Sequence, residues 1–139
     1  MAEGIARKVL SEGNPFKISS AGSSAQDGLP ASSLAVEVAG VKSVDLSTHK
    51  ARLLNETLVK EADLIVAMGS NHRHTVGIIE PSALGYTYLL TDFCDDEDGD
   101  VADPIGAGLD GYERVYMVID KCVKAMKDKL QNFDGWKTK

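Results

Sequence analysis

The chain has 139 residues, of which 43% are hydrophobic and 26% are charged, and its formal net charge is −6. These values fit one globular domain, and the negative charge without any basic run argues against a nucleic-acid partner. No apolar run reaches membrane-spanning length and no signal peptide is visible, so we expect no membrane partner. Two cysteines, Cys94 and Cys122, form neither a disulfide framework nor a metal cluster, which favours a reducing compartment, the cytoplasm.

The first half of the chain predicts three helices, a shorter helical piece and one strand. Helical spacing of apolar residues predicts a helix over 1–12, and residues 16–20 resemble a short strand. A second helix is expected over 30–39, because a proline stands near its first turn and a glycine just past its end. Residues 47–49 lead into the short helical piece. Asn55 can cap a third helix that runs through residue 61.

The second half continues the alternation of strands and helices. The almost continuous apolar run 63–68 is typical of a parallel strand that is buried on both faces. A helix over 70–80, a strand over 86–90 and a long amphipathic helix over 111–130 follow. This order predicts an α/β domain with a mostly parallel sheet over residues 1–130, followed by a polar tail over 131–139.

The loop before the last helix carries a carboxylate at a rigid turn. In Asp103-Pro104 the proline fixes its own φ and moves the aspartate out of the helical region. Asp110 and Glu113 predict a capping box for the helix that follows. A carboxylate held in this way suits general acid catalysis, because an acid must be positioned before its pKa matters. On the local pattern alone, an ordinary Asp-Pro turn is the simpler interpretation.

Five acids crowd the segment just before this loop: Asp95, Asp96, Glu97, Asp98 and Asp100. A solvated acidic loop is the first interpretation. A calcium site is the weaker one, because the run lacks the alternating ligands, the glycine and the final glutamate of an EF-hand loop. We therefore predict no metal site and no cofactor.

Taken together, several segments resemble the low-molecular-weight protein tyrosine phosphatases, from Met1 to about Leu130. The matching pieces are Met1-Ala2-Glu3, Ser19-Ser20-Ala21-Gly22, His49-Lys50-Ala51-Arg52, the run 62–68, and Asp103-Pro104 with Gly106, Asp110 and Tyr112. The resemblance implies a three-layer α/β fold with a mostly parallel four-stranded sheet flanked by helices. It aligns Asp103 with the family's general acid, and Ser20 and His49 with residues that brace the phosphate loop. It also places Ile105 at the rim of the substrate pocket.

The sequence departs from this family at its nucleophile. In relatives a Cys-x5-Arg loop after the first, central strand cradles the phosphate, and Met-Ala-Glu follows the loop directly. Here Met-Ala-Glu is residues 1–3. Six residues before the four arginines stand Met1, Leu46, Ala67 and Gly108, so no Cys-x5-Arg occurs in the sequence. Cys94 lies in the acidic run and Cys122 on an apolar helix face, and neither is a credible nucleophile. We expect an N-terminally incomplete chain that lacks the first strand and is inactive as given.

The resemblance implies a protein phosphatase, a hydrolase that dephosphorylates phosphoprotein through a cysteinyl-phosphate intermediate. Phosphotyrosine is the family's usual substrate, but Ile105 replaces an aromatic residue common in phosphotyrosine-specific relatives, which weakens that preference. Some relatives act on phosphoarginine instead, which is the alternative substrate. A non-catalytic, phosphatase-like binding protein is the second hypothesis. An arsenate reductase of the same fold ranks third, because it needs a closely spaced resolving cysteine pair, which Cys94 and Cys122 do not provide. The sequence makes no prediction of oligomeric state.

Overall fold

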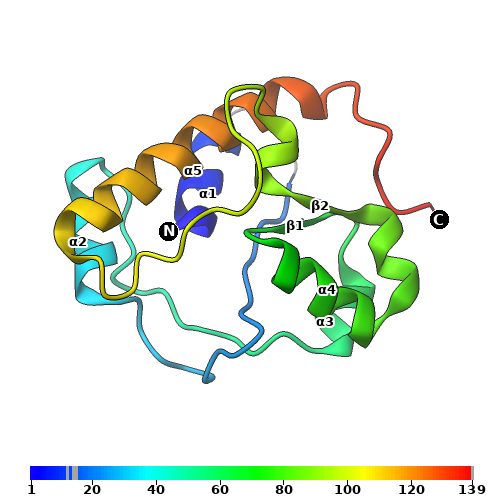
Figure 1. Cartoon of the computed structure of the whole chain (residues 1–139), viewed down its shortest axis with the longest axis horizontal. Helices are drawn as coiled ribbons and strands as arrows, with labels where there is room; N and C mark the ends of the chain where they lie inside the picture. Colours follow the sequence, from blue (N-terminus) through cyan, green and yellow to red (C-terminus); the bar gives the residue numbers. More distant parts are fainter. Residues whose placement is uncertain (12, 14–15, 139) are drawn as a thin grey trace.

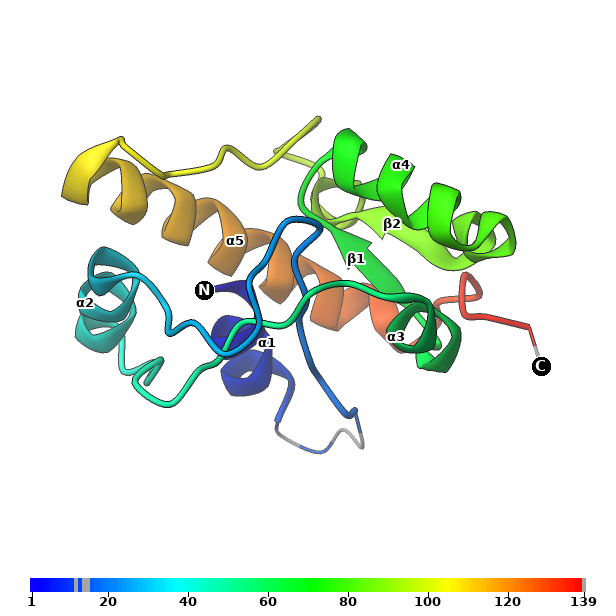
Figure 2. The same ribbon diagram turned by 90° about the horizontal axis from the view of Figure 1, so that it is seen from below.

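A computed structural model describes residues 1–11, 13 and 16–138 of the chain. At its centre two short parallel strands, β1 (Ile65–Ala67) and β2 (Thr87–Leu89), pair in register with Ile65 opposite Thr87. Figures 1 and 2 show these strands between two groups of helices. One group comprises α1 (Ala2–Leu10), α2 (Ser33–Val41) and α5 (Gly108–Leu130), and the other comprises α3 (Glu56–Glu61) and α4 (Ser70–Ile79). The fold is α/β with a parallel sheet, as the sequence predicts.

Two 3₁₀ turns flank β2, η1 (Pro81–Tyr86) before it and η2 (Leu90–Phe93) after it. The apolar run at 63–68 and the segment 86–90 both form strands, each shorter than expected. The helix predicted at 70–80 forms as α4, and Asn55 caps α3 as expected, because its side chain accepts a hydrogen bond from the Leu58 amide at 3.0 Å.

The strand expected at residues 16–20 does not form a ladder with any described segment. The backbone there has no assigned helix or strand. The Ile18 carbonyl accepts a hydrogen bond from the Arg7 guanidinium at 2.6 Å, and the Ser20 carbonyl accepts one from Arg52 at 3.2 Å. Side-chain donors thus satisfy carbonyls that a neighbouring strand would otherwise bond. The residue pattern indicated a strand, but a strand also needs a pairing partner.

Two helix predictions in the first half need correction. The helix expected at 30–39 begins at Ser33, because the Ser32 hydroxyl caps it by accepting a hydrogen bond from the Ala35 amide at 3.3 Å. Pro30 instead lies in an isolated antiparallel bridge with Lys50. The short helical piece expected after residues 47–49 does not form: a turn lies at 47–48, where the Asp45 side chain accepts a hydrogen bond from the Ser47 amide at 2.8 Å, and no helix is assigned before α3.

The capping box predicted for the last helix is also wrong. Helix α5 begins at Gly108, two residues before Asp110, and the residue ahead of it, Ala107, provides no side-chain cap. Gly106 (φ 82°) and Gly108 (φ 69°) adopt left-handed conformations that residues with a Cβ resist, and these let the chain enter the helix early. Asp110 therefore lies in the first turn, where its negative charge interacts favourably with the helix dipole.

The larger of two hydrophobic cores is built on α5. Its buried stripe packs against α1, α2 and η2, and this stripe includes Val115, Ile119, Val123 and Met126. A smaller core lies around α3, α4 and η1, with Val59, Val76, Ala83 and Tyr86 at its centre. None of the described helices combines the length and apolarity needed to cross a bilayer.

The residues after α5 pack against the body of the molecule. Phe133 lies edge-on to Tyr88, with ring centroids 5.2 Å apart, and Trp136 stacks on Phe16 at 5.7 Å. The Lys137 amide donates to the Asp63 carbonyl at 2.7 Å, which connects this segment to the start of the β1 region. The division into a domain over 1–130 and a tail over 131–139 stays a prediction.

The packing of α1 on α5 gives a stability test. Ile5 is only 1% exposed in the large core, so Ile5→Ala should reduce the free energy of unfolding by about 2–5 kcal/mol. Val41, at the end of α2, is 79% exposed, and Val41→Ala should stay within about 0.5 kcal/mol. Urea unfolding followed by circular dichroism measures both. Equal losses for the two variants would contradict the placement of α1.

Candidate functional site

The loop that carries Asp103 is fixed where it leaves the sheet. The Val101 amide donates to the Met68 carbonyl at 2.7 Å, just beyond the end of β1. One residue earlier, the Asp100 carboxylate accepts a hydrogen bond from the Ser70 amide at 2.8 Å, at the start of α4. The chain thus passes the carboxyl end of β1 under two constraints before it reaches Asp103. In parallel sheets this end is where ligands usually bind.

The turn at Asp103 is locally ordered and open to solvent. Asp103 Oδ1 accepts a hydrogen bond from the Ile105 amide at 3.0 Å, and the Ala107 amide donates to the Pro104 carbonyl at 2.9 Å. The Ile105 side chain is 79% exposed. Asp103 is therefore an accessible carboxylate whose orientation is set by its own turn, as the Asp-Pro pattern predicts.

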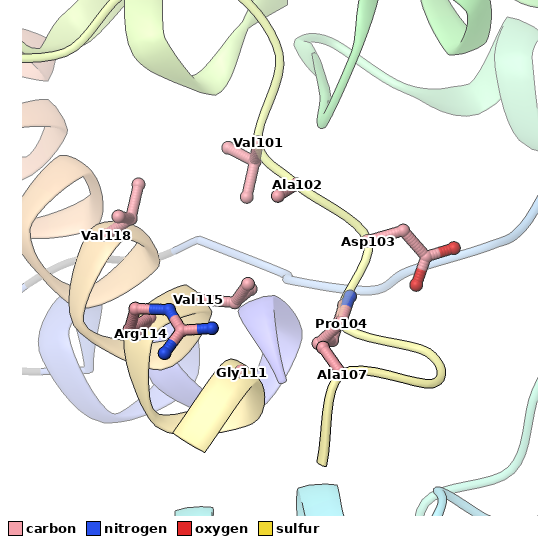
Figure 3. A pocket seen from close by; sticks show the side chains of 9 residues that line it. All are labelled: Val101, Ala102, Asp103, Pro104, Ala107, Gly111, Arg114, Val115 and Val118. Atoms are coloured by element: carbon pink, nitrogen blue, oxygen red, sulfur yellow. The ribbon is translucent and has the colours of Figure 1, made fainter. Parts of the chain in front are cut away.

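A cavity of about 170 Å³ lies between this loop and α5. Its walls are mostly apolar and include Val101, Pro104, Val115 and Val118, with Arg114 at one side. Figure 3 shows that these side chains gather on the α5 side of the loop, whereas the Asp103 carboxylate points away from them. Asp103 itself also lines this cavity, but its carboxylate is turned away from the apolar side chains.

A second group of polar side chains gathers around Glu3, in the first turn of α1. The Ser20 hydroxyl donates a short hydrogen bond to Glu3 Oε2, and His49 Nδ1 lies 3.7 Å from the same oxygen. Arg7 donates to Glu3 Oε1 from Nη2 at 2.8 Å and from Nε at 3.0 Å. Glu3 therefore joins three segments of the chain that are far apart in sequence.

The pKa of Glu3 reflects two opposing effects. Burial alone raises the pKa of its carboxyl group, since it disfavours the charged form. Hydrogen bonds from Ser20 and Arg7, together with the charges of Arg7 and His49, outweigh burial and hold the pKa below its usual value of 4.5. Glu3 is accordingly an anion at neutral pH and an acceptor for its neighbours.

The structure brings together two of the four site residues expected from the sequence. Ser20 and His49 meet at Glu3, a residue that the sequence marked only as part of Met-Ala-Glu. Among the described residues no hydrogen bond or ion pair joins Asp103 to this group. Ile105 lies in the Asp103 loop, where its amide donates to the Asp103 carboxylate. The signal for Glu3 was an acid in the first turn of a helix, which is ambiguous because helix starts favour acids in general.

Both cysteines are buried in the large core. Burial raises the pKa of the Cys122 thiol to about 12, and the adjacent Cys94 side chain contributes further through a hydrogen bond and its charge. A thiol with such a pKa is protonated at neutral pH and is a poor nucleophile. Cys122 is therefore a core residue, as predicted.

Comparison with known proteins assigns the chain to a family. The model of the low molecular weight phosphotyrosine protein phosphatases matches residues 1–134. The chain is 30% identical over 131 residues to a probable low molecular weight protein-tyrosine-phosphatase, EpsP, of Ralstonia solanacearum, covering 94% of this chain and 86% of that protein. It is 29% identical to a protein-arginine-phosphatase of Geobacillus stearothermophilus, covering 83% and 77%. The chain belongs to the low-molecular-weight protein tyrosine phosphatase family.

Solved structures agree with this assignment. The low molecular weight protein tyrosine phosphatase of T. tengcongensis superposes with a TM-score of 0.85 at 33% identity, covering 92% of this chain and 88% of that one. Wzb of Vibrio vulnificus, in complex with benzylphosphonate, gives 0.82 at 29% identity, covering 92% and 87%. The α/β fold implied by the resemblance is therefore confirmed.

The lowered pKa of Glu3 predicts how its contribution depends on pH. Because the folded pKa lies below the unfolded value of 4.5, this carboxylate stabilises the fold above about pH 4.5. The stabilisation is lost as the pH falls through the folded pKa. Glu3→Gln should therefore be less stable than wild type at pH 6.5, and the difference should shrink at pH 3. Urea unfolding at both pH values measures it.

Glu113→Gln is the matched control, because Glu113 is exposed on α5 and makes no hydrogen bond or ion pair within the described residues. It should leave stability nearly unchanged at both pH values. If the loss of unfolding free energy in Glu3→Gln grew on acidification, these partners would not be what stabilises the Glu3 carboxylate.

Proposed function

We propose that this chain provides the general acid of a protein phosphatase site, and that Asp103 is that acid. The observation that carries the proposal is an exposed Asp103 on a loop that is bonded to the ends of β1 and α4. Membership of a phosphatase family supplies the reaction class. A general acid needs a fixed carboxylate within reach of solvent-borne substrate, and this loop provides one.

The reaction we propose has two displacements. A cysteine thiolate attacks phosphorus to form an S–P bond, the bond to the leaving oxygen breaks, and Asp103 gives its proton to that oxygen. Water then attacks phosphorus and gives a proton to the Asp103 carboxylate, while the S–P bond breaks to release phosphate and the thiolate. Asp103 thus acts as acid in the first step and as base in the second.

The 139 residues of the chain do not supply the thiolate. They contain no Cys-x5-Arg, and both cysteines are buried, with the pKa of Cys122 raised to about 12 by burial. We therefore propose that the 139 residues alone do not turn over a phosphate ester, and that activity requires a Cys-x5-Arg loop supplied in addition. Buried thiols also fail to provide the exposed resolving pair of an arsenate reductase, which argues against that alternative.

Ser20 and His49 are proposed to support such a loop, with the Glu3 carboxylate beside both: it accepts a hydrogen bond from Ser20 and lies 3.7 Å from His49 Nδ1. The hydrogen bond to Glu3 orients the Ser20 hydroxyl, and the same carboxylate lies beside the His49 imidazole; positioned neighbours of this kind are what a phosphate-binding loop needs. In the absence of that loop the same residues could still bind a phosphorylated ligand, which is the non-catalytic alternative. Turnover by a protein that carries the loop distinguishes the two.

The proposed substrate is a phosphorylated protein. Relatives of this chain carry the names protein-tyrosine-phosphatase and protein-arginine-phosphatase, so both phosphotyrosine and phosphoarginine are proposed. Ile105 stands exposed two residues after Asp103 and offers apolar contact without an aromatic ring to stack on the substrate. A cytoplasmic location stays a prediction.

The first functional prediction concerns the chain alone. Purified 139-residue protein should hydrolyse an aryl phosphate no faster than its own Asp103→Asn variant, because an acid without a nucleophile contributes little. Release of the phenolate chromophore measures the rate. Turnover that disappears in Cys94→Ser or Cys122→Ser would contradict this, because one of these thiols would then be the nucleophile.

The second functional prediction uses an extended protein, in which the strand and Cys-x5-Arg loop of a relative precede Met1. Asp103→Asn should lower its kcat by about 10²–10⁴-fold and leave KM nearly unchanged, since proton transfer occurs only in the transition state. Asp98→Asn, an exposed acid nearby, is the control and should keep full activity. A loss confined to KM would remove Asp103 from the acid role, and an inactive extended protein would overturn the proposed function.

A further inference from the structure

The acidic segment before the Asp103 loop is more than a solvated run. Asp95 pairs with Lys129 at 3.0 Å and Glu97 pairs with Lys121 at 2.5 Å, so two of its acids face α5. Both pairs are exposed, and exposed ion pairs contribute little to stability. Asp100 differs, because its carboxylate reaches a different helix, α4, and bonds to backbone.

Asp100 caps the start of α4 from a distance of 30 residues in sequence. Its Oδ1 accepts a hydrogen bond from the Ser70 amide at 2.8 Å, and its Oδ2 lies 3.4 Å from the Ser70 hydroxyl. The residue in the cap position of α4 is Gly69, which has no side chain to do this. Free amides and the positive end of the dipole make a helix start a favourable place for a carboxylate.

The residues on either side of Asp100 are also bonded. The Gly99 carbonyl accepts a hydrogen bond from the Thr91 hydroxyl at 2.6 Å, and the Val101 amide donates one to the Met68 carbonyl at 2.7 Å. Three consecutive residues, 99–101, are therefore attached to η2, to α4 and to the end of β1. Asp103 follows two residues later, and Pro104 restricts the backbone beyond it.

We propose that Asp100 is a positioning residue for Asp103: by capping α4 it fixes the start of the loop and so the place of the acid. This rests on the proposed function in so far as Asp103 is the general acid. A purely structural role would stabilise α4 and leave the loop unaffected. The two roles differ in what happens at Ile105, whose amide reports on the Asp103 turn.

Amide hydrogen exchange of the 139-residue protein separates these roles. Asp100→Ala removes the cap, and the Ser70 amide should exchange about 5–30-fold faster. If Asp100 positions the loop, the Ile105 amide should also exchange faster. Asp100→Asn keeps an oxygen acceptor for the Ser70 amide and should restore both rates. Asp98→Ala, which changes an exposed acid without a hydrogen bond among the described residues, should change neither.

Two exchange results would overturn the proposal. Faster exchange at Ser70 with an unchanged Ile105 amide would show that Asp100 only caps a helix. A Ser70 amide that exchanges in wild type as fast as in an unstructured peptide would show that the cap does not form.

Kinetics of the extended protein test the consequence for catalysis. Asp100→Ala should lower kcat by up to about 10²-fold with KM nearly unchanged, because small misplacements of a catalytic group are costly. Asp100→Asn should recover the rate. Ile5→Ala, which is destabilised without touching the loop, controls for stability and should keep its kcat. Full kcat in Asp100→Ala would overturn the proposal. An extended protein that is inactive without any substitution would instead refute the proposed function, and hydrogen exchange alone would then test whether Asp100 caps α4 and positions the loop.

Discussion

The buried stripe of α5 is the surface on which most of the molecule is assembled. Helices α1 and α2 and the turn η2 all pack against it in the large core. Glu3 lies in the first turn of α1, and the Asp103 loop leads directly into α5. Glu3 and the Asp103 loop are therefore carried by helices that share one hydrophobic contact, α1 and α5. Burial of apolar area is non-directional, so it brings these elements together but does not set the orientation of their polar side chains.

Orientation comes from a small number of polar contacts that cross between segments. At Glu3, hydrogen bonds and opposite charges outweigh the effect of burial and keep the carboxylate ionised. Arg7 and Arg52 bind carbonyls of the extended segment 16–20, which has no strand partner among the described residues. Charged donors to carbonyls are stronger than neutral ones, but two such bonds replace only part of a strand ladder. This segment is therefore held more by side chains than by sheet.

The sequence predicted the features that depend on neighbouring residues. Asn55 capped α3 because a cap needs only its own turn, and the apolar run around Val66 formed a parallel strand, although only Ala67 in it is fully buried. Prediction failed where the decisive partner was distant or the backbone unusual. Gly108 entered α5 in a left-handed conformation, which moved the helix start away from Asp110. Nothing in the local pattern showed that Glu3 would meet residues 17 and 46 positions away, or that Asp100 would reach α4.

These long-range contacts have a common physical origin. Each polar group at the end of an element must find a partner when packing removes it from water, and unpaired groups cost more than paired ones gain. Gly69 leaves the start of α4 without a side-chain cap of its own, and the Met68 carbonyl lies just beyond the end of β1. The segment 100–101 satisfies both, one with a carboxylate and one with an amide. The loop that provides the hydrogen-bond acceptor for the start of α4 is thereby also placed at the carboxyl end of the sheet. The position of Asp103 is in this sense a consequence of backbone hydrogen-bonding requirements at the end of β1.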